Sequence, residues 1–254
     1  MDMAPSPYPQ VLPSRVDLIA TTSARWRTYF EVVENQHADV TASDIGPLAK
    51  SVDNGLRISL PVFQISQIGT GEHLLEAARK IGDDDYFEAL RLFVKEEQEH
   101  ARLLALVCNE LDIDMLDSHW TNTAFRFARR TFGLRAELLV LLVAEFVSDA
   151  FYAALADGVG DPVLSQIFGR IQADEVRHLD FHAATLPEFL DRWPRPVFNA
   201  VRFGWSALVV GSALIVAVDH RKALRASGVS SIRYVGAVIK KLRTHKDRIF
   251  RARS

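Results

Sequence analysis

The stretch Asp174-Glu175-Val176-Arg177-His178 contains a Glu-x-x-His unit, and the stretch Glu96-Glu97-Gln98-Glu99-His100 contains a second one. Residues three apart on a helix lie about 60° from one another on one face, so each Glu and His can bind the same ion. The spacing alone is weak evidence, because 13 Glu and 8 His in 254 residues give about 0.4 units by chance (13 × 8/254). A third unit, Glu34-Asn35-Gln36-His37, lies at the polar end of a predicted helix, and we assign it to the surface.

Helical periodicity dominates the chain around these units. Apolar residues recur every three or four positions, and hairpin signals between alternating runs are nearly absent, so we predict an all-α fold. We expect a loop over 41–55 and helices over 16–34, 61–81, 85–110, 134–156, 162–185 and 197–224, with a last helix from Ser230 or Ser231. Segments 61–110 and 134–185 then form two helical hairpins, each with a Glu-x-x-His unit on its second helix.

The predicted helix 134–156 supplies a further carboxylate. Glu145 is the only polar residue in the run Leu138-Leu139-Val140-Leu141-Leu142-Val143-Ala144-Glu145-Phe146-Val147. A buried, unpaired carboxylate costs several kcal/mol or takes up a proton, so a positive group should face Glu145. A metal ion would satisfy it.

The symmetry of an antiparallel hairpin selects the fourth carboxylate. Glu145 and Glu175 are centred on Gly160 in the turn of the second hairpin. In the first hairpin, Glu72 and Glu97 are centred on the turn at 83–85, whereas Glu76 would move the centre into the next helix. Glu72 is therefore preferred, and Glu76 stays open as the alternative.

The order Glu72, Glu97-x-x-His100, Glu145, Glu175-x-x-His178 resembles the ferritin-like di-iron carboxylate proteins, which build a dinuclear site inside a four-helix bundle. The resemblance covers about residues 60–185. Asp174-Glu175-Val176-Arg177-His178 is also similar to the Asp-Glu-x-Arg-His segment of oxygen-activating members such as ribonucleotide reductase small subunits and bacterial hydrocarbon monooxygenases. Leu104 stands where reductase subunits would carry a radical tyrosine, and Ile171 where arylamine N-oxygenases carry a third histidine.

This resemblance implies a non-haem di-iron oxidase or oxygenase that activates O2 to hydroxylate, desaturate or N-oxygenate an organic substrate. It implies two iron ions, with Mn/Fe as the alternative, and an external electron donor such as a ferredoxin or reductase. It also implies that Asp174 hydrogen-bonds His100 and that Glu96 hydrogen-bonds His178. Iron storage, or metal binding without oxygenase activity, is the alternative function.

Three more residues share faces with the expected ligands. His182 follows Glu175 by seven and His178 by four, so it is a candidate third histidine ligand or a hydrogen-bond donor to the site. Asp149 and Tyr152 follow Glu145 by four and seven, and could line a pocket or relay protons.

Composition separates the chain into an acidic body and a basic tail. Residues 220–254 hold 11 Lys and Arg and one acid, whereas residues 1–219 hold 19 Lys and Arg and 31 acids. We expect a flexible lead-in over 1–14, a ferritin-like domain over 15–229 and a basic amphipathic tail over 230–254. Within the domain we place the metal-binding bundle at about 60–186 and an apolar helix packed on it at about 197–224.

The partners and the compartment follow from the same pattern. The tail could dock on an anionic carrier protein, a membrane surface or the protein's own acidic body. A homodimer stays an alternative. The sequence has no nucleic-acid-binding motif, which disfavours nucleic acid as a partner. One cysteine and an N-terminus unlike a signal peptide lead us to expect a cytoplasmic protein.

Overall fold

The computed structural model describes residues 21–34, 42–69, 71–120, 123, 133–190 and 193–251. These residues form helices and connections without a strand, which confirms the all-α prediction. The lead-in over 1–14 lies outside the described residues. The helices are α1 (Thr22–Glu34), α2 (Lys50–Gln67), α3 (Glu72–Arg79), α4 (Asp84–Glu110), α6 (Leu134–Gly158), α7 (Pro162–Leu190), α8 (Arg195–Asp219), α9 (Arg221–Ala226) and α10 (Ser231–Ile249).

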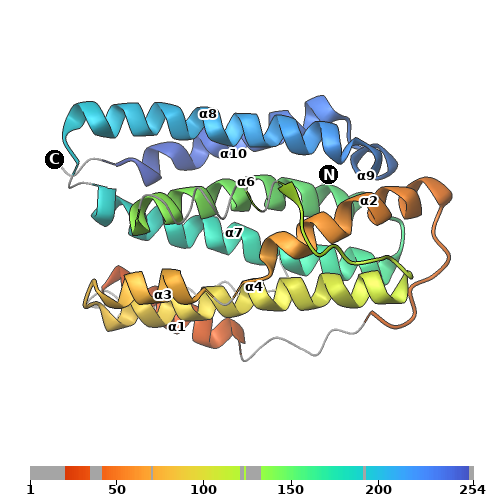
Figure 1. Ribbon diagram of the computed structural model, residues 1–254, viewed down its shortest axis with the longest axis horizontal. Helices are drawn as coiled ribbons and strands as arrows, with labels where there is room; N and C mark the ends of the chain where they lie inside the picture. The colour runs from red at the N-terminus through yellow and green to blue at the C-terminus, as the bar shows by residue number, and fades with distance from the viewer. Residues whose placement is uncertain are drawn as a thin grey trace, which may run out of the picture.

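The helices are arranged in layers (Figure 1). The antiparallel pair α6 and α7 lies in the middle, α4 with α1 and α2 packs on one side, and α10 with α8 packs on the other. The turn between α6 and α7 contains Gly160, whose φ of 78° favours glycine. Asp161 then caps α7, because its carboxylate accepts a hydrogen bond from the Leu164 N–H at 2.9 Å. This turn fixes the register that brings Glu145 opposite Glu175.

The predicted helix 61–81 is broken in the structure, and the predicted loop 41–55 is too long. Gly55 lies inside α2, and a side-chain carbon there would lie only 2.6 Å from Ala223 Cα, so glycine lets α9 pack directly on α2. α2 ends at Gln67, and α3 begins after Gly71, which has φ 66° and lies against the Val94 side chain. α3 therefore does not continue the axis of α2.

The two most apolar helices differ in how they pack. Among the described residues, α6 and α8 are the helices whose length and composition would suffice to cross a membrane. In the apolar window of α6, 78% of the residues are buried, against 28% in that of α8. The predicted helix 197–224 is thus divided at His220 into α8 and α9, and α8 packs on the protein through one face only.

Candidate metal centre

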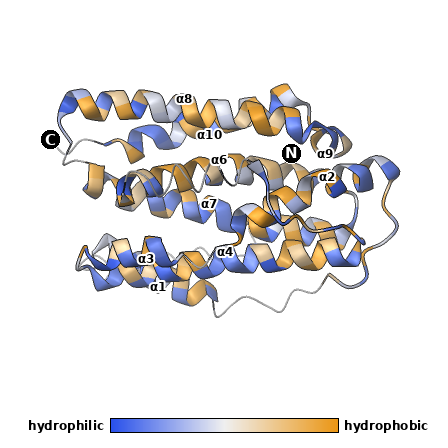
Figure 2. Cartoon of the chain, in the orientation of Figure 1, coloured by the Kyte–Doolittle hydropathy of each residue, from blue (hydrophilic) through white to orange (hydrophobic). Residues whose placement is uncertain are grey.

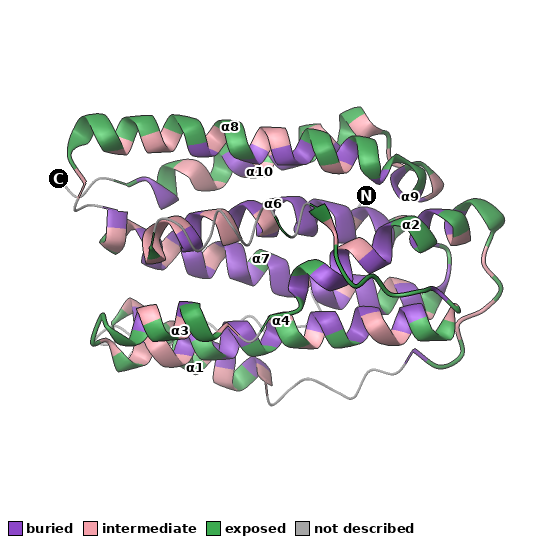
Figure 3. Ribbon diagram, in the orientation of Figure 1, coloured by how far each residue is buried: buried purple, intermediate pink, exposed green. Residues whose placement is uncertain are grey.

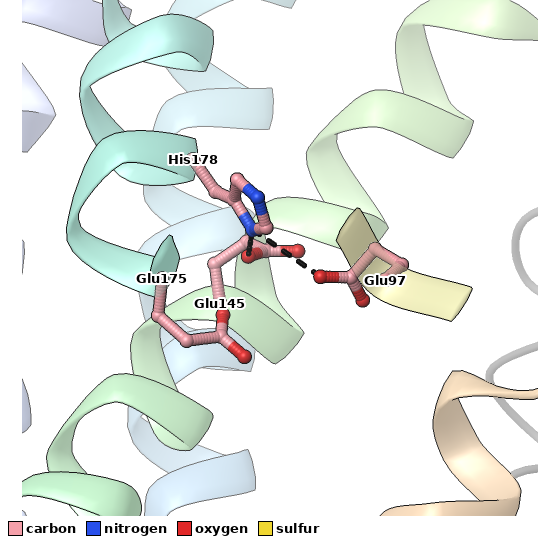
Figure 4. Close-up of side chains that lie close together, drawn as sticks. All are labelled: Glu97, Glu145, Glu175 and His178. Atoms are coloured by element: carbon pink, nitrogen blue, oxygen red, sulfur yellow. Dashed lines mark hydrogen bonds and ion pairs between the residues drawn. The ribbon is translucent and has the colours of Figure 1, made fainter. Parts of the chain in front are cut away.

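Three helices bring acidic and histidine side chains together in the core. α4 contributes Glu97, α6 contributes Glu145, and α7 contributes Glu175 and His178 (Figure 4). One potential ligand atom from each of these four residues lies within 4.8 Å of all the others. Glu145, Glu175 and His178 are buried, and Glu97 is half-buried. This group, hereafter the cluster, could hold a metal ion.

His178 presents one ring nitrogen to the cluster and the other to an acid outside it. Its Nδ1 lies 3.1 Å from Glu145 Oε2 and 3.2 Å from Glu97 Oε1. Its Nε2 lies 2.9 Å from Glu96 Oε2. A carboxylate bound to Nε2–H leaves the Nδ1 lone pair directed at the cluster.

His100 of α4 repeats this arrangement from the opposite side. Its Nε2 lies 3.0 Å from Asp174 Oδ2, and its Nδ1 lies 3.4 Å from Glu97 Oε1 and 3.8 Å from Glu175 Oε1. The ring is fully buried, and within the described part of the chain Nδ1 has no hydrogen-bond partner. Both crossed contacts, Asp174 with His100 and Glu96 with His178, are thus present.

Protonation offsets part of the negative charge of the cluster when no metal ion is bound. Burial, and then the neighbouring Glu145 and Glu97, raise the pKa of Glu175 well above its ordinary value. Burial alone would lower the pKa of His178, but Glu145, Glu96 and Glu97 raise it well above its ordinary value. Without metal, protons on Glu175 and His178 offset the crowded carboxylates, and a metal ion would displace them.

Glu72 is not brought to the cluster, so the preferred fourth carboxylate is a wrong prediction. It is the first residue of α3 and is exposed, as is Glu76, because Leu74 and Ala78 form the buried face of this helix. Aromatic rings pack beside His178 instead: the ring centroids of Phe93 of α4 and Phe30 of α1 lie 4.6 and 6.4 Å from that of the imidazole. The break after α2 moves Glu72 away from the core.

The side chain that the first hairpin places beside the cluster is Gln67. Its Nε2 donates a hydrogen bond of 3.4 Å to Glu175 Oε1, and Gln64, one turn earlier, is also buried. We missed both residues by searching for acids only. The sequence does contain a signal for them, since the two glutamines lie three residues apart on the apolar face of the segment 56–67.

His182 lies buried on the same face of α7 as Glu175 and His178, although it is not part of the cluster. Neither ring nitrogen has a hydrogen-bond partner among the residues that the structure describes. Burial, and then His178, lower its pKa to about 3. His182 is therefore a neutral imidazole with two unsatisfied nitrogens close to the cluster.

Asp149 and Tyr152 have different positions. Asp149 accepts a hydrogen bond from Gln172 Nε2 at 2.9 Å and forms an ion pair with Lys241 of α10, so it anchors the C-terminal helix instead of extending the site. Tyr152 is fully buried; burial, then Glu175 and Glu97, raise its pKa well above the ordinary value. Tyr152 therefore borders the cluster.

The basic tail is not free in the structure. α10 packs on α6, α7 and α8, and Arg248 joins Asp180 at 2.6 Å. Through the Arg248–Asp180 and Lys241–Asp149 pairs, the tail contacts acidic residues of the protein's own body, which was one of the expected alternatives.

Fold and cluster together define an all-helical protein with a buried carboxylate–histidine group that could bind metal. Comparisons of this chain with protein-family models, with curated proteins and with solved structures find no match.

Proposed function

We propose that this chain is a ferritin-like, non-haem di-iron oxidase or oxygenase. The observation that carries the proposal is the opposed pair of imidazoles. His100 and His178 come from different helices, their ring centroids are 5.7 Å apart, and each directs Nδ1 at shared carboxylates while its Nε2 contacts an acid. Two such histidines suit two ions that share Glu97, Glu145 and Glu175.

The donor set favours iron or manganese. Carboxylate oxygens with neutral imidazoles suit Fe(II) and Mn(II), and a structural zinc site would ordinarily hold four ligands including cysteine. Three Glu carboxylates offset most of the charge of two divalent ions. His182, with two unsatisfied nitrogens, supports a further ligand at this site.

When bound, the two iron ions would supply the redox chemistry with O2. The chain's own residues have other tasks. Glu96 and Asp174 hold the two imidazoles in one tautomer. Arg177, beside Asp174, offsets the charge of these two carboxylates. The aromatic residues around His178 and His182 exclude water. Tyr152 holds its proton at the edge of the cluster.

The partners that go with this proposal are O2, an organic substrate and an external electron donor such as a ferredoxin or reductase, in the cytoplasm. Hydroxylation, desaturation and N-oxygenation all fit the same site, since the ligands set the metal chemistry and the substrate sets the product.

Anaerobic loading with Fe(II), metal analysis and rapid mixing with O2 test the proposal. We expect two iron ions per chain and a transient absorption change that depends on O2. The double variant Glu175→Ala, His178→Ala should lose the iron and keep its helical circular dichroism. The matched control is Glu34→Ala, His37→Ala, which removes the third Glu-x-x-His unit and should keep the iron.

Three results would contradict this proposal. A cluster variant that retains wild-type iron would place the metal elsewhere. Iron that binds but gives no spectral change with O2 would refute the oxidase. A large closed shell on size exclusion would favour iron storage.

A further inference from the structure

Helix α8 has two unlike faces. One face packs on the protein through Trp205, Val209 and Ala213, and the Trp205 Nε1–H donates a 2.7 Å hydrogen bond to the carbonyl of Leu139 in α6. The opposite face is exposed along the helix (Figure 3) and is largely apolar (Figure 2). Its exposed large apolar side chains are Val197, Phe203, Leu208, Leu214, Ile215 and Val218.

This face carries no free charge over more than 20 residues. Between Arg195 and Asp219 the only charged residue is Arg202, whose guanidinium pairs with Asp247 of α10 at 2.6 Å. Phe203 is 79% exposed. A contiguous apolar strip of this kind on a protein surface marks an interaction site.

The start of α10 lies beside the C-terminal end of the strip. The Ser231 hydroxyl donates a 2.7 Å hydrogen bond to the Ala217 carbonyl, so the two helices lie side by side at this end. The next residue, Ile232, is 85% exposed. We call the exposed apolar residues of α8 together with Ile232 the outer face.

Positive charge gathers at the same end of the molecule. Over residues 219–233 the chain has four bases and one acid, Asp219, and all five are exposed. The bases are Arg221, Lys222, Arg225 and Arg233. An apolar helical face with a basic margin is the pattern of a helix that lies in the surface of an anionic membrane.

We propose that the outer face docks on an anionic lipid bilayer, with α8 parallel to the membrane plane. A spanning orientation is disfavoured because the other face of α8 is packed on α6 and α10 and includes the Arg202–Asp247 pair, which would enter the hydrocarbon. This proposal is independent of the metal chemistry.

A second copy of the chain fits the outer face less well. Two copies would bring eight of these bases and two acids to the contact, so a second copy would add to the excess of positive charge. Anionic lipid headgroups supply the opposite charge.

Vesicle flotation of the full chain tests the proposal. Wild-type protein should float with vesicles of equimolar phosphatidylglycerol and phosphatidylcholine, bind phosphatidylcholine alone more weakly, and be released by alkaline carbonate. The double variant Phe203→Ser, Ile232→Ser should weaken binding by at least about tenfold. Its matched control is Ile68→Ser, since Ile68 is 54% exposed outside the outer face.

The basic margin is tested separately. Lys222→Glu should weaken binding to the anionic vesicles by at least about fivefold, and Lys80→Glu, an equal charge change at an exposed site between α3 and α4, should not. Four results would overturn the proposal: no binding to either vesicle, equal binding of the outer-face variant and wild type, resistance to carbonate extraction, or a dimer that the outer-face variant converts to a monomer without vesicle binding.

Discussion

Helices α6 and α8 have the same length of 25 residues, and both pass a composition test for membrane-crossing segments. Their environments are opposite, because α6 is enclosed by α7, α8 and α10, whereas the described residues contact α8 on one side only. The difference shows that apolar composition does not determine what a helix contacts. The polar residues of each helix are more informative.

In α6 the informative residue is Glu145, since a carboxylate in an enclosed helix needs compensation, and the cluster supplies histidines and a metal-binding geometry. In α8 the informative feature is the position of charge at the ends. Its apolar outer face is bordered by bases, which favours an anionic surface as its environment.

The largest expected effect comes from truncating matched phenylalanines on the two helices. Phe146 of α6 is fully buried, and Phe146→Ala should lower the free energy of unfolding by about 3–5 kcal/mol. Phe203 of α8 is 79% exposed, and Phe203→Ala should change it by at most about 0.5 kcal/mol. Urea unfolding of the metal-free proteins measures both values.

Similar losses of unfolding free energy in the two variants would contradict the difference between α6 and α8. A cost of several kcal/mol for Phe203→Ala would mean that the outer face is covered in solution by another part of the chain or a second copy.

The second prediction concerns the carboxylate of α6. Glu145→Leu should abolish iron binding and raise the unfolding free energy of the metal-free protein by about 1–4 kcal/mol, because it removes one of the crowded buried carboxylates while Glu96 and Glu97 still pair with His178. Metal analysis and urea unfolding are the measurements. Glu137→Leu is the control, since Glu137 is also buried on α6 but lies outside the cluster and contacts His73.

Glu145→Leu protein that keeps its iron would contradict the metal centre. A less stable metal-free variant would show that Glu145 serves the fold and not the site.

Sequence reasoning could find the residues of α4, α6 and α7 because each lies on a long, uninterrupted helix. There the three-residue spacing and the symmetry about the Gly160 turn fix which side chains meet. The same symmetry failed for Glu72, because it assumes that α2 and α3 share one axis. At the break, Gly71 lies against Val94 of α4 with a positive φ, and this contact between residues far apart in the sequence is not visible in the helical periodicity.

The third prediction uses His220, where α8 ends against α6. Its Nδ1 lies 3.0 Å from Ser59 Oγ, its ring is 5.6 Å from Phe151, and burial lowers its pKa from 6.5 to about 4. Between these pH values the unfolded chain binds a proton here and the folded chain does not, so acidification favours unfolding. We expect His220 to account for about 2 kcal/mol of stability lost between pH 6.5 and 4.

Urea unfolding of wild type and His220→Gln across this pH range measures the contribution. The variant should lose less stability on acidification than wild type. Parallel pH profiles would mean that His220 reaches water, and that the end of α8 is less firmly packed on α6 than the structure indicates.

The smallest expected effect concerns the hydrogen bond that joins the two helices. Trp205→Phe keeps most of the buried ring and removes the Nε1–H donor to Leu139, so the unfolding free energy should fall by about 1 kcal/mol. Trp120→Phe, at a residue 59% exposed, should leave it unchanged. Vesicle binding should be unaffected by Trp205→Phe, since Phe203 and Ile232 remain. If Trp205→Phe lowers both the unfolding free energy and vesicle binding, the packed and outer faces of α8 are coupled. If it lowers the unfolding free energy alone, the two faces act independently, one packing on the protein and the other binding the membrane.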